Sequence, residues 1–214
     1  MKRIALVACL LAAVAAPIPA REAAKPPSRH VIEGVAPLQG RDVMVKGITR
    51  ALRVVYDPDL SEDYLFGLSG LAFSATVCAN NCTCRDFREM YTSIDATLDA
   101  LGVPYEFLEG KDPAIWEKMK ASIAAGVPVT AWGLFGDRCD AAMVGYDEEK
   151  DLAYGWGMKP DGKEYMSASL SKFTGGWMSS YVLAPAKKTD RAALERTRLE
   201  HVVRMAHRAS LEGG

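Results

Sequence analysis

The chain has 214 residues, 49% of them hydrophobic, which is enough for one globular domain with its own core. Its 26 basic and 27 acidic residues nearly balance, and no basic run is interleaved with aromatic residues. This composition excludes the basic surface typical of nucleic-acid-binding proteins, so we expect no nucleic-acid partner.

Residues 1–20 have the layout of a secretory signal peptide. Lys2 and Arg3 precede an apolar run that ends at Ala16, and small residues then lead to Ala20. The run is too short to favour a membrane span, and no other segment of the sequence is a candidate for one. We expect cleavage near Ala20 and an exported mature protein, periplasmic or extracellular, without a membrane span.

Residues 21–29 are expected to form a flexible lead-in, because Pro26 and Pro27 disfavour both helix and sheet. Helices are predicted where apolar residues recur at helical spacing behind a capping residue or ahead of a glycine. They begin at Asp42, Ser93 and Asp112, and they end at Val55, Leu101 and Gly126.

Strand candidates follow these helices, at residues 128–134, 141–146, 152–156 and 178–183. Early helices followed by an antiparallel sheet indicate the α+β class, in a domain spanning residues 30–185. A charged terminal helix is expected within residues 186–208. Its apolar residues available for packing are Leu194, Leu199, Val202, Val203 and Met205.

The order and spacing of several motifs resemble those of bacterial papain-like domains. The motifs are Ser61–Cys84 with its glycines, Gly126-Val127-Pro128-Val129, Gly145-Tyr146-Asp147, and Ser169–Trp177. The similarity covers roughly residues 30–184. The relevant relatives are the N-terminal domain of the butirosin-biosynthesis acyltransferase and double-glycine-peptidase-like domains. The resemblance implies a papain-like, that is cysteine-peptidase-like, fold.

The resemblance also implies where catalytic groups would lie. Such enzymes place a cysteine at the start of the first core helix, a histidine across the cleft, and an Asn or Asp that orients the histidine. In this sequence the first two places fall on Val43 or Met44 and on Cys139 or Asp140, and the third falls on residues 155–157. None of these carries the required group, so we expect no papain-type peptidase activity.

Three residues remain weak candidates for chemistry. Gln39 lies near where such enzymes place an oxyanion donor, Asp140 can transfer a proton, and Cys139 can act as a nucleophile beside Arg138. The histidines do not help: His30 is interpreted as a surface or strand-edge residue. His201 and His207 are six positions apart on a helix, too far around it to clamp one metal together.

The mature chain keeps an even number of cysteines: Cys78, Cys82, Cys84 and Cys139. Disulfides are the first interpretation, because an exported chain meets an oxidising environment. A four-thiolate zinc site is the second, although the cluster spacing is uncommon for zinc. A reactive unpaired cysteine, best placed at Cys139, is the third. No other cofactor is expected.

Two classes of function therefore stand. The first is an exported papain-like-fold protein with a degenerate active site that binds a peptide or small ligand in the former cleft, or has a structural role. Trp132, Trp156 and Trp177 are its candidate cleft-lining residues. The second is a cysteine-dependent acyl or aminoacyl transferase or peptidase that uses Cys139 or a cluster cysteine. The lack of a suitably placed histidine favours the first.

We predict that Cys139 forms a disulfide with a cysteine of the segment 78–84, because pairing Cys82 with Cys84 would close a very tight ring. The mature protein, titrated without reductant, is expected to show no fast-reacting thiol, and Cys139→Ser is expected to expose one. A fast-reacting thiol in the wild type, or stoichiometric zinc by elemental analysis, would refute the disulfide.

Overall fold

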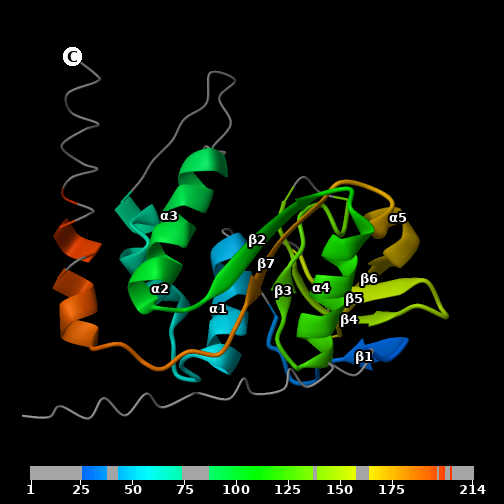
Figure 1. The fold of residues 1–214 in the computed structure, drawn as a ribbon, viewed down its shortest axis with the longest axis horizontal. Coiled ribbons are helices and arrows are strands. Elements are labelled where there is room, and N and C mark those ends of the chain that lie inside the picture. Colours follow the sequence, from blue (N-terminus) through cyan, green and yellow to red (C-terminus); the bar gives the residue numbers. More distant parts are fainter. Residues whose placement is uncertain are drawn as a thin grey trace, which may run out of the picture.

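The computed structural model describes residues 26–37, 43–73, 87–136, 139–157, 164–196, 198–200 and 203. Figure 1 shows a helical lobe beside a sheet lobe. The helical lobe contains α1 (Val43–Val55), α2 (Glu62–Leu68), the 3-10 helix Leu71–Phe73, and α3 (Phe87–Leu101). Residues 191–196, 198–200 and 203 are also helical and lie at its outer side (Figure 1).

The sheet lobe is built on a five-stranded antiparallel sheet with the order β1-β4-β5-β6, in which β3 also pairs with β4. Its strands are β1 (Arg29–Val31), β3 (Val129–Thr130), β4 (Ala142–Asp147), β5 (Leu152–Trp156) and β6 (Met166–Ser169). Helices α4 (Pro113–Ala124) and α5 (Leu170–Thr174) belong to the same lobe. This arrangement confirms the predicted α+β class.

A two-stranded ribbon of β2 (Tyr105–Gly110) and β7 (Met178–Leu183) stands between the lobes (Figure 1). Side chains alternate between the faces of a strand, so one ribbon can serve two cores. Tyr181 and Leu183 pack into the core of the helical lobe, whereas Met178 and Val182 pack into that of the sheet lobe. The ribbon therefore contributes side chains to the cores of both lobes and connects them through packing.

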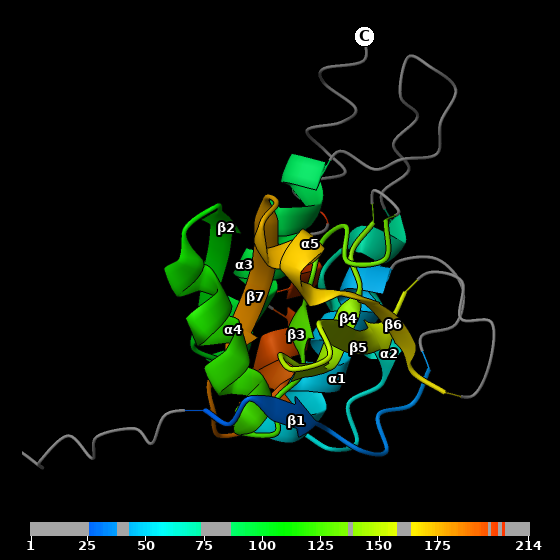
Figure 2. The ribbon, with the colours of Figure 1, turned by 90° about the vertical axis from the view of Figure 1, so that its right-hand side faces the viewer.

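Strand β3 joins this ribbon to the larger sheet, and Figure 2 shows it between β7 and β4. The Tyr181 amide donates to the Thr130 hydroxyl at 2.8 Å, and the Trp132 amide donates to the Ser179 carbonyl at 3.1 Å. Helix α1 packs closely on this junction, because a Cβ at Gly47 would lie 3.4 Å from the Thr130 methyl group.

The C-terminal segment satisfies the last carbonyl of each of α1, α2 and α3. The Val55 carbonyl accepts the Ala186 amide at 2.9 Å, and the Leu101 carbonyl accepts the Thr189 hydroxyl at 2.6 Å. The Leu68 carbonyl accepts Nε of Arg198 at 2.8 Å. Helices leave such terminal carbonyls without intrahelical partners, so the segment completes all three helix ends.

Several helices and strands begin and end at or next to the residues predicted from the sequence. Helices α1 and α4 and strands β5 and β7 lie where the sequence places them. Helix α3 begins at Phe87, before the predicted Ser93, and β3 keeps two residues of the predicted 128–134. The sequence reading missed β1, β2, β6, α2 and α5.

Packing of the terminal helix differs from the prediction. Leu194 is 4% exposed and joins the helical core, but Leu199 and Val203 are 61% and 56% exposed and do not pack. Val202, Met205 and the expected signal peptide lie outside the described residues. Within the described part of the chain, no helix is long and apolar enough to cross a membrane.

We predict that Arg198→Met lowers the free energy of unfolding by about 3 kcal/mol, because charged hydrogen bonds to buried carbonyls are lost. Arg198 is 4% exposed, and its guanidinium also donates to the carbonyls of Ala96 (3.3 Å) and Ser69 (3.4 Å). Urea unfolding of dilute protein measures the change. Arg196→Met, at an exposed arginine of the same segment, is the control and is expected to stay within about 0.5 kcal/mol. Equal effects of the two changes would contradict the proposed anchoring.

Candidate functional site

The candidate site lies at the start of β4, where residues 131–141 connect it to β3. Ala131 and Ala141 exchange two backbone hydrogen bonds, at 2.9 and 3.0 Å, and the Gly133 amide donates to the Cys139 carbonyl at 2.8 Å. Gly133 has a φ of 73°, a left-handed conformation that suits glycine. The backbone of Cys139 is thus fixed, and its side chain is half-buried.

Asp140 is buried, and its carboxylate interacts with a tyrosine of α3. Burial, and then the negative charge of Asp140, raise the pKa of Tyr91 to about 12, although a hydrogen bond with Ser179 opposes the shift. A phenol with this pKa stays neutral near neutral pH, so it can take part in hydrogen bonds but cannot accept a proton.

A second buried phenol lies beside Tyr91. The rings of Tyr91 and Tyr181 are 6.1 Å apart, and the Tyr181 hydroxyl donates to Oδ1 of Asp95 at 2.7 Å. Burial and this hydrogen bond raise the pKa of Tyr181. Both tyrosines are therefore fixed hydrogen-bonding groups rather than general bases.

Residues 155–157, where the sequence resemblance would place an orienting Asn or Asp, are closely packed and leave no room for such a side chain. A Cβ at Gly155 would lie 2.2 Å from the Ala142 carbonyl oxygen, at a point where the β4–β5 register shifts. Trp156 is 1% exposed, and its indole donates to the Val35 carbonyl at 2.8 Å. A Cβ at Gly157 would lie 2.9 Å from the Phe135 ring. Packing at all three positions therefore leaves no space for an orienting side chain.

The Gly-Tyr-Asp motif that ends β4 also has structural explanations. A Cβ at Gly145 would lie 2.8 Å from the carbonyl oxygen of His30, which is on the paired strand β1. Tyr146 is fully buried in the core of the sheet lobe. Asp147 accepts the Lys150 amide at 3.0 Å and so closes the following turn. The motif builds the sheet without needing a catalytic histidine.

The residues of α1 include no cysteine. Met44 is 2% exposed and belongs to the core of the helical lobe, and Val45 is 1% exposed. Asp42 and the oxyanion candidate Gln39 lie outside the described residues. The expectation that Val43 or Met44 replaces the papain-type cysteine is compatible with this packing.

The candidate cleft-lining tryptophans separate into different environments. Trp156 is a core residue and does not line a cleft, which corrects the sequence-based expectation for it. Trp132 is half-buried, whereas Trp177 is 53% exposed. The Trp132 amide donates to the carbonyl of Ser179, which is on β7 two residues after Trp177.

Of the four cysteines expected in the mature chain, only Cys139 is among the described residues. Cys78, Cys82 and Cys84 lie outside the described residues, so the disulfide with Cys139 stays a prediction, as does the zinc alternative. Among the residues that the structure describes, no group of His, Cys, Asp and Glu could hold a metal.

Sequence reasoning missed the cavities of the helical lobe. Among the described residues, a cavity of ≈310 Å³ lies between the α1–α2 connection and the C-terminal segment, and one of ≈330 Å³ lies between α2 and the same segment; both are lined by Tyr64. In the first, Lys188 already pairs with Asp57 at 2.7 Å. Arg191 pairs with Glu195 at 2.7 Å and covers the Tyr64 ring. These contacts close the lobe and point to no particular ligand.

Comparison with protein-family models, with curated proteins and with solved structures finds no match. The chemistry of the site therefore rests on its residues. Half-buried Cys139 directly precedes buried Asp140, and no histidine is among the described residues of the connection 131–141. The described groups of this site can form hydrogen bonds and aromatic contacts, and among the described residues no cysteine–histidine pair of the kind used for acyl transfer lies here.

We predict that Gly155→Ala lowers the free energy of unfolding by about 3 kcal/mol or prevents folding, because its Cβ would overlap the Ala142 carbonyl. Gly67→Ala is the matched control, since a Cβ in this α2 position meets nothing within 4 Å. Alanine is the better helix former, so the control is expected to be neutral or stabilising by up to about 1 kcal/mol. Chemical unfolding of both variants provides the comparison, and a neutral Gly155→Ala would show that the strands can separate there.

Proposed function

We propose that this chain is an exported protein of papain-like fold that binds a peptide or a small ligand between its lobes and does not hydrolyse it. The architecture supports the fold part of the proposal. A helical lobe faces a sheet lobe, and α1 packs against β3 and the start of β4 at Gly47. In papain-like domains the first core helix meets the histidine-bearing strand in this way.

The close packing of residues 155–157 supports the proposal that the protein has no papain-type catalysis. An orienting side chain at Gly155 would overlap the Ala142 carbonyl, and Trp156 is held in the core by its bond to Val35. Restoring a triad would need repacking of β5 in addition to a new cysteine and a new histidine. Loss of such groups removes several orders of magnitude of rate, and binding is what remains.

The start of β7 supplies the proposed binding surface. Trp177 is 53% exposed, and half-buried Trp132 and Cys139 lie on the neighbouring connection. Exposed indoles offer a large apolar area with one hydrogen-bond donor, which suits peptide side chains and small aromatic ligands. The neutral phenol of Tyr91 beside Asp140 and Ser179 adds fixed polar groups nearby.

We predict that the mature protein enriches members of a random heptapeptide library or is stabilised by members of a small-molecule fragment library. For the best binder, Trp177→Ala is expected to weaken affinity about tenfold or more, measured by calorimetry. Val54→Ala is the control, because Val54 is equally exposed, at 53%, but lies on α1. Failure to bind either library, or equal losses in both variants, would contradict the proposal.

The enzymatic alternative has a separate readout. A peptide chloromethyl ketone is expected not to label the protein, because the described residues around this site bring no histidine that could activate a thiol. Labelling that Cys139→Ala abolishes would instead assign a cysteine-dependent transferase or peptidase.

A further inference from the structure

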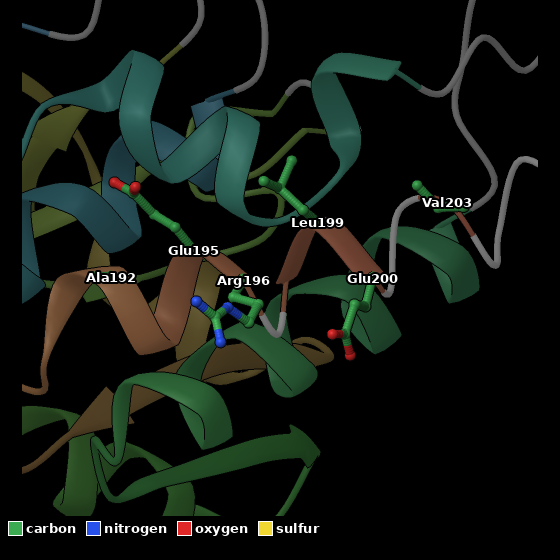
Figure 3. Close-up of a pocket in the computed structure, with 6 residues that line it drawn as sticks. All are labelled: Ala192, Glu195, Arg196, Leu199, Glu200 and Val203. Carbon is green, nitrogen blue, oxygen red and sulfur yellow. The ribbon is translucent and has the colours of Figure 1, made fainter.

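We draw no further inference here: the strongest candidate, the exposed groove of ≈740 Å³ that Leu199 and Val203 line along the C-terminal helical segment (Figure 3), carries none because nothing in the structure shows what covers it.

Discussion

The helical lobe depends on one constraint: the carbonyls at the ends of α1, α2 and α3 need donors, and residues 186–198 supply them. The donors are chemically different, namely the Ala186 amide, the Thr189 hydroxyl and the Arg198 guanidinium. Each anchors the segment at another helix end, and Leu194 fills the core between them. The helices are thus held at their ends as well as along their sides.

In the region between the lobes, single residues also make several interactions. Tyr181 contributes its ring to the helical core, its amide to Thr130 and its hydroxyl to Asp95. The site at the start of β4 is therefore surrounded by groups that already have partners. At Gly155 and Gly145 the neighbouring strands lie so close that a side chain would overlap the backbone of the next strand.

Elements with local signals could be predicted from the sequence. The cap at Asp112 and the proline after it mark α4, and the Asp112 carboxylate does accept the Ala114 amide at 2.9 Å. The pairing of β2 with β7 joins residues far apart in the chain, so the ribbon as a unit could not be predicted from local patterns. The contacts of Asp140 with Tyr91, and of Gly155 with Ala142, arise only on folding. Sequence spacing could thus point to this part of the chain as a candidate, but it could not reveal the packing around it.

The position of β7 late in the chain has a consequence for the order of folding during synthesis. Both cores contain side chains of β7, and carbonyls at the helix ends accept hydrogen bonds from residues that follow β7 in the chain. A growing chain that lacks residues 178–198 has neither core complete, so stable structure forms only when most of the chain is present. Such late closure keeps the polypeptide unfolded for longer while it is being synthesised.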